Sequence, residues 1–220
     1  MTEKQRHPAK LERGRGKVAN DPLALPEGLP VPEDDGAADH LQGMRLPTVT
    51  LPSTSGREVD VAEVSRRGRV IVYCYPLTAP DVELPEDWDL IPGARGCTPE
   101  ACSFRDHHDE LRELGVEMVF GLSTQTTGYQ KGLVERLHLP FEVLSDSELA
   151  FVQALRLPTF EVERSIALQP TTLVKRLTLV LLDSGIEKVF YPIFPPNEHV
   201  GEMVAWLSEN PVQLGERAGT

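Results

Sequence analysis

The stretch GRVIVYCYP (residues 68–76) is apolar, β-branched or aromatic at almost every position until it ends at Pro76. An unbroken run of this kind, without alternating polar residues, is typical of a central strand whose two faces are both buried. We therefore expect this segment to form the middle of a sheet, with strands beside it and helices available for both faces.

The segments on either side of this strand predict further strands and helices. Two short alternating runs around Ser55-Gly56 predict a β-hairpin at 46–64. Downstream patterns indicate a helix at 98–114, a strand at 116–124, a helix at 126–139, a strand at 140–146, a helix at 147–155, a hairpin at 176–193 and a helix at 197–210. This order predicts a thioredoxin-like α/β fold, with a mixed central sheet flanked by helices and an N-terminal β-hairpin.

The 220 residues are enough for one domain with appendages. Residues 1–42 are rich in Pro, Gly and charge and show no periodicity, so we expect a flexible or wrapped arm. The thioredoxin-like domain is expected at 43–210, followed by a tail at 211–220.

The formal charge of -12 argues against a nucleic-acid-binding surface, which needs clustered Lys and Arg. Residues 1–20 differ in charge from the rest of the chain, because six basic and two acidic side chains give them a charge of +4. Such a basic segment is typically a solvated tail. No apolar run approaches the roughly 20 residues that span a bilayer, and the N-terminus lacks the hydrophobic core of a secretory signal. We therefore expect no membrane contact and a cytoplasmic location.

The segment GARGCTPEACSFRD (93–106) carries two of the three cysteines at the start of a predicted helix. Thr98-Pro99-Glu100 supplies a capping hydroxyl, a proline that the first turn tolerates, and an acid that suits the positive end of the helix dipole. Cys97 immediately precedes this start, and the free N–H groups of a helix N-terminus favour thiolate over thiol. Because the thiolate is the nucleophilic form, Cys97 is the candidate reactive group.

Cys102 lies five residues further along the predicted helix. Five helical residues rise about 7.5 Å and turn by roughly 140°, so a Cys97–Cys102 disulfide requires the first turn or two to unwind. A zinc site built from these cysteines and the His107-His108 pair is disfavoured, because the four positions do not converge as closely spaced pairs. We expect no metal and no cofactor. Cys74, inside the central strand, is interpreted as a small buried apolar residue.

The residues GCTPEACSFRD (96–106) resemble the active-site segment of peroxiredoxins of the Q type, the bacterioferritin co-migratory thiol peroxidases. In that family a strand ending in Tyr-Pro is followed by a TPGC-type loop and then by TxEAC and FRD. The similarity extends over about residues 44–208 and includes RLTLVLLDSGIEKVFYPI (176–193) as the hairpin before the last helix. It implies a thioredoxin-dependent peroxidase.

The resemblance also implies roles for individual residues. Cys97 is the expected peroxidatic cysteine, which a hydroperoxide oxidises to sulfenic acid. Cys102 is the expected resolving cysteine, which forms an intramolecular disulfide that thioredoxin or a similar dithiol protein reduces. Arg176 matches the arginine that approaches the peroxidatic sulfur and stabilises its charge. Peroxiredoxins of this type are commonly monomeric, so we expect a monomer or weak dimer.

One position departs from the family pattern. The family has a threonine three residues before the peroxidatic cysteine, where its hydroxyl binds the peroxide, but this chain has Ala94 there. The run after Tyr75-Pro76 is also longer by about fourteen residues. Three explanations stay open. Thr78 is the displaced equivalent of the family threonine, Arg95 has taken over part of the role of that threonine in binding peroxide, or peroxide is a poor substrate. Thr78 is therefore included among the candidate site residues.

Two functions of other classes stay open beside the peroxidase. The first is a redox sensor or binding protein, in which the cysteines detect oxidation and the arm or the 77–96 loop contacts a partner. The second is a thioredoxin-fold enzyme redirected to other chemistry, which the absent threonine suggests. The 77–96 loop, with Trp88 and several carboxylates, is interpreted as a lid, a partner-docking surface or a spacer.

Overall fold

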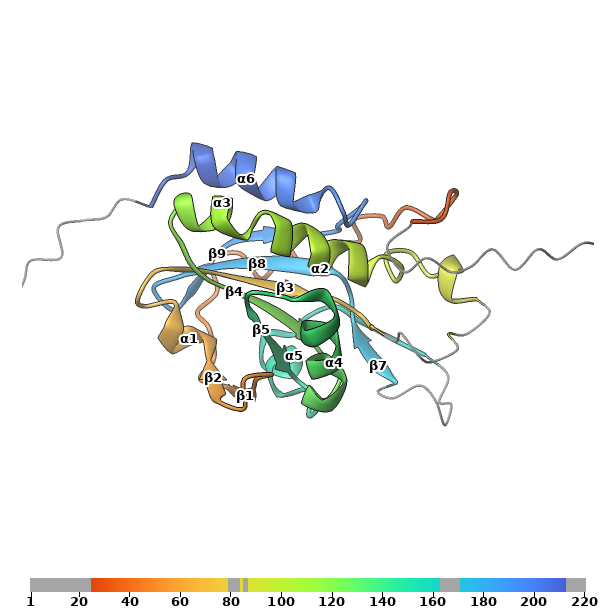
Figure 1. Ribbon diagram of the computed structural model, residues 1–220, viewed down its shortest axis with the longest axis horizontal. Helices are drawn as coiled ribbons and strands as arrows, with labels where there is room; N and C mark the ends of the chain where they lie inside the picture. The colour runs from red at the N-terminus through yellow and green to blue at the C-terminus, as the bar shows by residue number, and fades with distance from the viewer. Residues whose placement is uncertain (1–24, 79–83, 85–86, 163–170, 213–220) are drawn as a thin grey trace, which may run out of the picture.

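The computed structural model describes residues 25–78, 84, 87–162 and 171–212, and its centre is a five-stranded sheet in the order β5-β4-β3-β8-β9 (Figure 1). The strands are β3 (Arg69–Cys74), β4 (Val116–Ser123), β5 (Glu142–Ser145), β8 (Leu177–Leu182) and β9 (Gly185–Phe190). β3, β4 and β5 run parallel to one another, whereas β8 is antiparallel to both β3 and β9. All six residues of β3 are buried, which confirms the predicted mixed sheet with this strand at its centre.

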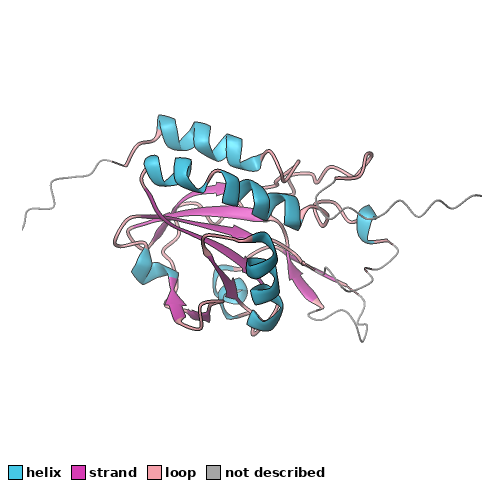
Figure 2. Cartoon of the chain, viewed as in Figure 1, coloured by secondary structure: helices cyan, strands magenta, loops and turns pink. Residues whose placement is uncertain are grey.

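Helices cover both faces of the sheet (Figure 2). One face carries α2 (Cys97–Asp106), α3 (His108–Glu113) and α6 (His199–Glu209), and α4 (Thr127–Leu137) contributes to the same apolar core. The other face is covered by α1 (Val61–Val64), α5 (Ala150–Leu155) and part of the N-terminal segment. The chain therefore has the predicted thioredoxin-like α/β fold.

The helix predicted from Thr98 onward differs from the structure in two ways. It begins one residue earlier, at Cys97, and its N-cap is Gly96 with no side-chain cap, so the expected capping role of Thr98 is wrong. Gly96 has φ 103°, a left-handed conformation that glycine adopts without steric cost and that turns the chain into the helix early. The helix is also divided into α2 and α3, because the backbone of His107 (φ -100°, ψ 9°) interrupts it.

The predicted N-terminal hairpin is present as β1 (Thr50–Pro52) and β2 (Glu58–Asp60), which pair in antiparallel fashion. The end of the predicted range is wrong, because 61–64 form α1 instead of a strand. The Asp60 carboxylate accepts a hydrogen bond from the Ala62 amide at 2.9 Å and caps this short helix. A second small antiparallel pair, β6 (Thr159–Glu161) with β7 (Thr172–Val174), was not predicted.

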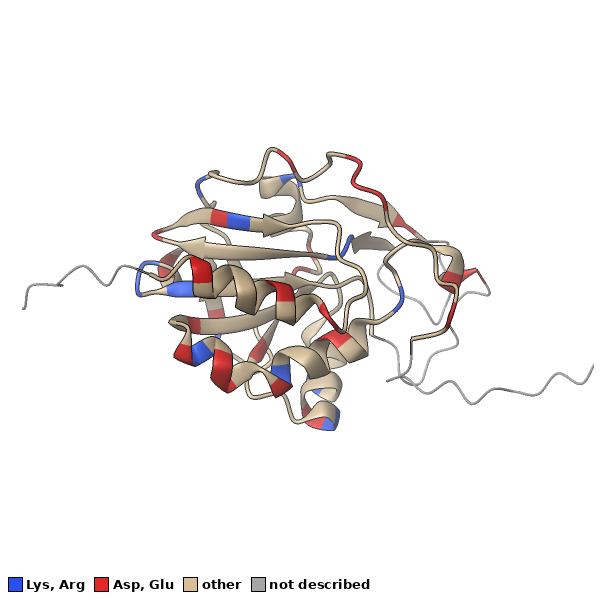
Figure 3. Ribbon diagram, turned by 90° about the horizontal axis from the view of Figure 1, so that it is seen from above, with Lys and Arg blue, Asp and Glu red and all other residues tan. Residues whose placement is uncertain are grey.

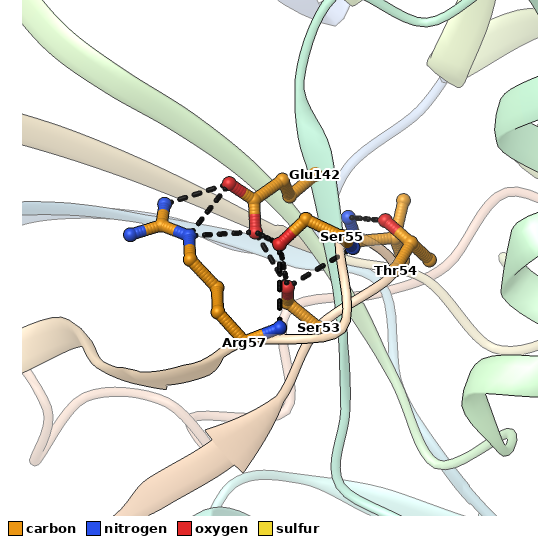
Figure 4. Close-up of polar contacts among 6 residues, drawn as sticks. Ser53, Thr54, Ser55, Arg57 and Glu142 are labelled. Atoms are coloured by element: carbon orange, nitrogen blue, oxygen red, sulfur yellow. Dashed lines mark hydrogen bonds and ion pairs between the residues drawn. The ribbon is translucent and has the colours of Figure 1, made fainter.

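Glu142, at the start of β5, holds the N-terminal hairpin against the central sheet (Figure 4). Its carboxylate accepts hydrogen bonds from Ser53, from Ser55 (2.8 Å) and from Nη2 of Arg57 (2.7 Å). Thr54 Oγ1 accepts a further bond from a β5 backbone amide at 3.0 Å. Burial alone would raise the pKa of Glu142, but the bonds from Arg57 and the two serines lower it below its ordinary value. The carboxylate is therefore ionised at neutral pH and fixes the hairpin.

The end of the described N-terminal segment, at Ala38 and Leu41, packs into the core on one face of the sheet. Leu41 is fully buried in the core, and His40 Nε2 donates to the carbonyl oxygen of Leu155 at 2.9 Å. Residues 1–24 of the predicted arm, its basic first twenty residues included, and residues 213–220 of the predicted tail lie outside the described residues.

Acidic positions are spread over the surface helices and the loops, with fewer basic positions between them (Figure 3). This distribution agrees with the negative charge of the whole sequence. Within the described ranges, no helix is both long enough and apolar enough to cross a membrane.

Candidate active site

Cys97 is the first residue of α2, and the residue is only 5% exposed. It belongs to an apolar cluster that also contains Tyr73, Tyr75 and Phe104. The predicted position of this cysteine at a helix entrance is confirmed. The backbone N–H groups of the first turn have no partner within the helix, so this location stabilises negative charge on the sulfur.

Arg176, immediately before β8, brings a cation to this sulfur from a position 79 residues away in the chain. Its Nη2 lies 3.1 Å from Cys97 Sγ, and its Nε donates to the carbonyl oxygen of Gly93 at 3.2 Å. Burial alone would lower the pKa of Arg176, but the nearby sulfur and the Glu100 carboxylate raise it. The guanidinium therefore remains charged and is held in one orientation against the sulfur.

Glu100 is a buried member of this site that the sequence did not reveal. Its position in the sequence predicts an acid beside the helix dipole, but its side chain is fully buried and forms an ion pair with Arg176 through Oε2. Among the residues that the structure describes, none forms a hydrogen bond with its Oε1. Burial raises the pKa of Glu100 to about 7, although Arg176 opposes the shift. The guanidinium of Arg176 thus contacts two acidic groups, the carboxyl of Glu100 and the sulfur of Cys97.

The three cysteines have different surroundings, and all are free. Cys102 lies within the intact α2 and is half-buried, and burial raises the pKa of its thiol while Arg105 partly opposes this. Cys74 is fully buried, as predicted, and burial raises the pKa of its thiol well above the ordinary value. Within the described ranges, no group of three His, Cys, Asp or Glu side chains lies close enough to hold a metal ion.

Thr78 is buried near the end of β3, but its hydrogen bonds go to another side chain. Its backbone amide and its hydroxyl both donate to Gln125 Oε1, at 2.9 and 3.2 Å, and Gln125 Nε2 donates back to the Thr78 carbonyl oxygen at 2.8 Å. Gln125 was not predicted, because no local pattern marks it. The expected role of Thr78 in binding peroxide stays a prediction.

Residues of the loop between β3 and α2 form a small apolar cluster with Phe160 of β6 and Leu173 of β7. Trp88, in a 3-10 turn at Trp88–Leu90, is 3% exposed and packs near Phe160, with ring centroids 6.4 Å apart. Ala94, where the family has threonine, is buried in the same cluster, and its carbonyl oxygen lies 3.6 Å from Cys97 Sγ. Arg95 pairs with Asp89 at 3.4 Å. The loop carboxylates at 81, 83 and 86 lie outside the described residues.

His199, the first residue of α6, is a second buried titratable group near the site. Its Nε2 lies 3.0 Å from Thr178 Oγ1 on β8, and its ring contacts Phe104 and Phe190. Burial, with a smaller contribution from the charge of Arg176, lowers the pKa of His199 to about 3. The imidazole is therefore neutral in the folded protein at any physiological pH.

We expect His199→Gln to change how stability depends on pH. In the unfolded chain the imidazole binds a proton near pH 6.5, but in the folded protein it stays neutral down to about pH 3. Stability is therefore lost as pH falls below 6.5, by about 1.4 kcal/mol per pH unit. Between pH 7 and pH 5, the destabilisation caused by His199→Gln should shrink by about 2 kcal/mol. Urea unfolding of both proteins at the two pH values measures this, and an equal difference at both would contradict it.

Comparisons with known proteins show the family to which the chain is related. The Redoxin family model matches residues 41–205. A chloroplastic peroxiredoxin Q of Oryza sativa subsp. japonica is 30% identical over 167 residues, which cover 76% of this chain and 66% of that protein. A putative peroxiredoxin bcp of Coxiella burnetii is 27% identical over 165 residues, which cover 75% of this chain and 97% of that protein. The chain thus spans slightly less than two thirds of the rice protein but almost all of the bacterial one.

Solved structures show the same fold. The crystal structure of peroxidoxin BcpB from Mycobacterium tuberculosis superimposes with a TM-score of 0.59 at 23% identity, covering 77% of this chain and 97% of that one. A structure of peroxiredoxin Q from Xanthomonas campestris gives a TM-score of 0.58 at 18% identity, covering 76% and 97%.

Proposed function

The chain belongs to the redoxin family and is similar to Q-type peroxiredoxins within it, and from this premise we propose that it is a thiol peroxidase that reduces hydrogen peroxide or organic hydroperoxides. The observation that carries the proposal is the 3.1 Å contact between Arg176 and the Cys97 sulfur, in a buried site at a helix entrance. A fixed cation and a helix N-terminus both stabilise a thiolate, which is the form that attacks peroxide.

In the first step, the Cys97 thiolate attacks one oxygen of the hydroperoxide. The S–O bond forms as the O–O bond breaks, so the sulfur is oxidised to sulfenic acid and the second oxygen leaves as alkoxide or hydroxide. The leaving oxygen takes up the proton that the thiol released earlier and departs as alcohol or water. Arg176 stabilises the charge as it moves from sulfur to this oxygen.

In the second step, Cys102 resolves the sulfenic acid. Its sulfur bonds to the Cys97 sulfur, the S–O bond breaks, and the hydroxyl leaves as water with the Cys102 proton. Both cysteines lie in the intact α2, so its first turn or two must unwind before the sulfurs meet. A dithiol protein such as thioredoxin then reduces the disulfide and becomes oxidised itself. We propose a cytoplasmic protein, monomeric or weakly dimeric, for this cycle.

Stopped-flow oxidation of the reduced protein, followed by intact mass, tests the proposal. One equivalent of hydrogen peroxide should lower the mass by about 2 units, because the disulfide forms with loss of two hydrogens. Sustained turnover with thioredoxin and its reductase would favour the enzyme over the redox sensor. An unchanged mass in excess hydrogen peroxide and in excess alkyl hydroperoxide would eliminate the peroxidase.

We expect Cys102→Ser to separate the two steps. The first oxidation should proceed within about twofold of the wild-type rate, because the Cys97–Arg176 contact does not involve Cys102. Turnover with thioredoxin should be lost, and the protein should gain about 16 mass units as an unresolved sulfenic acid. Full turnover in this variant would show that Cys102 is not the resolving residue.

A further inference from the structure

An apolar pocket of about 360 Å³ lies next to Arg176, between parts of the chain that are distant in sequence. Its walls include Pro32 from the N-terminal segment, Ile91 from the loop before α2, Phe160 from β6, and Ile193 after β9. This volume is at the lower end of the range for small-molecule sites, which are mostly apolar with a few polar groups. The pocket is therefore suited to a compact apolar ligand.

Two residues that line the pocket, Arg176 and Gly93, also take part in the contacts around the Cys97 sulfur. Arg176 lines it and also places Nη2 3.1 Å from Cys97 Sγ. Gly93 lines it as well, and its carbonyl oxygen accepts the hydrogen bond from Arg176 Nε at 3.2 Å. A ligand held in this pocket therefore lies next to Arg176, the residue whose guanidinium contacts the sulfur.

The polar groups at the pocket are not available to bind an anion. Lys175 Nζ donates to one Asp35 oxygen at 2.7 Å, and the Tyr191 hydroxyl donates to the other at 2.8 Å. These two hydrogen bonds hold the pKa of Asp35 far below its ordinary value, so its charge offsets that of Lys175. Glu33, another lining residue, adds a negative charge. Arg176, the other lining cation, is already paired with Glu100 and the Cys97 sulfur, so a ligand carboxylate would lose its hydration here without gaining that cation, whereas an uncharged hydrocarbon has no such cost.

We propose that this pocket binds the uncharged hydrocarbon part of a compact organic hydroperoxide while its O–O group lies at the Cys97 sulfur. The proposal rests on the thiol peroxidase function and specifies its substrate class. Burial of the apolar surface of the ligand supplies the binding. Hydrogen peroxide has no hydrocarbon part, so its reaction does not depend on the pocket.

The test compares Ile91→Trp with Leu90→Trp in single-turnover oxidation of Cys97. Ile91 lines the pocket, whereas Leu90 is its exposed neighbour, 74% accessible, and does not line it. Ile91→Trp should fill the pocket and slow the reaction with cumene hydroperoxide at least tenfold. The rate with hydrogen peroxide should stay within twofold of the wild-type rate. Leu90→Trp should leave both rates within twofold. If Ile91→Trp does not fold, Ile91→Ser should give a smaller selective loss, of about threefold, by removing apolar surface.

The charge of the substrate provides a second comparison. Cumene hydroperoxide should react at least fivefold faster than its para-carboxylated analogue in the wild type, and Glu33→Gln should narrow this difference. The pocket assignment would be overturned if Ile91→Trp slowed the reactions with cumene hydroperoxide and hydrogen peroxide equally, or slowed neither. It would also be overturned if the wild type reacted equally fast with the neutral and the carboxylated compound. Each of these leaves hydrogen peroxide reduction by the wild type intact, so they are distinguishable from failure of the peroxidase proposal.

Discussion

Replacement of Cys97 by serine is expected to abolish hydroperoxide reduction, lowering the second-order rate constant by a factor on the order of a thousand or more. A serine hydroxyl stays protonated beside Arg176 at neutral pH and is a poor nucleophile in that form. The helix entrance and the guanidinium then have no anion to stabilise. Stopped-flow consumption of hydrogen peroxide and of cumene hydroperoxide by the reduced variant measures the loss.

Cys74→Ala is the matched control for this experiment. Cys74 is also a buried thiol, but it packs in the core on the opposite face of the sheet from Cys97. Its removal should lower stability slightly and leave the oxidation rate within about twofold. Retained peroxidase turnover in Cys97→Ser would show that another group reacts, and the proposed function would fail.

The parts of the fold that the sequence predicted are those whose patterns are local. β3 is a continuous apolar run, and the hairpin of β8 and β9 has its turn at Asp183-Ser184, where both residues have positive φ. The β6–β7 pair was not predicted because its strands have three residues each, too few for a periodic signal. The start of α2 was misplaced by one residue because the backbone of Gly96, and not a side chain, determines it.

The candidate site was predictable only in part, for a different reason. The position of Cys97 follows from residues beside it in the chain, and the structure agrees with that reasoning. Arg176 was proposed only through a family resemblance, since a charge at the end of a strand is ordinarily exposed. The antiparallel pairing of β3 with β8 sets Leu177 opposite Cys74, so Arg176 lies at the end of β3 from which the chain continues to α2. Local sequence patterns carry no information on such pairing. Glu100 was misinterpreted because its partner is remote in sequence.

Replacement of Arg176 by methionine is expected to lower the rate constant for peroxide reduction by about a hundredfold to a thousandfold. The variant keeps the apolar stem but loses the Nη2 contact with Cys97 Sγ, so the charge that moves to the leaving oxygen is no longer stabilised. It also leaves Glu100 buried without its cation, which costs about 3–5 kcal/mol of stability if the carboxyl stays charged. With a pKa near 7 even in the wild type, Glu100 should take up a proton instead.

The double variant Arg176→Met/Glu100→Gln separates the loss of catalysis from the loss of stability, because it removes both members of the buried ion pair. It should unfold at a denaturant concentration closer to that of the wild type, yet remain as slow toward hydrogen peroxide as Arg176→Met. Arg67→Met, which removes an arginine that is 72% exposed, should leave both properties unchanged. Recovery of the rate together with stability in the double variant would mean that Arg176 acts by holding the fold and not by stabilising charge at the sulfur.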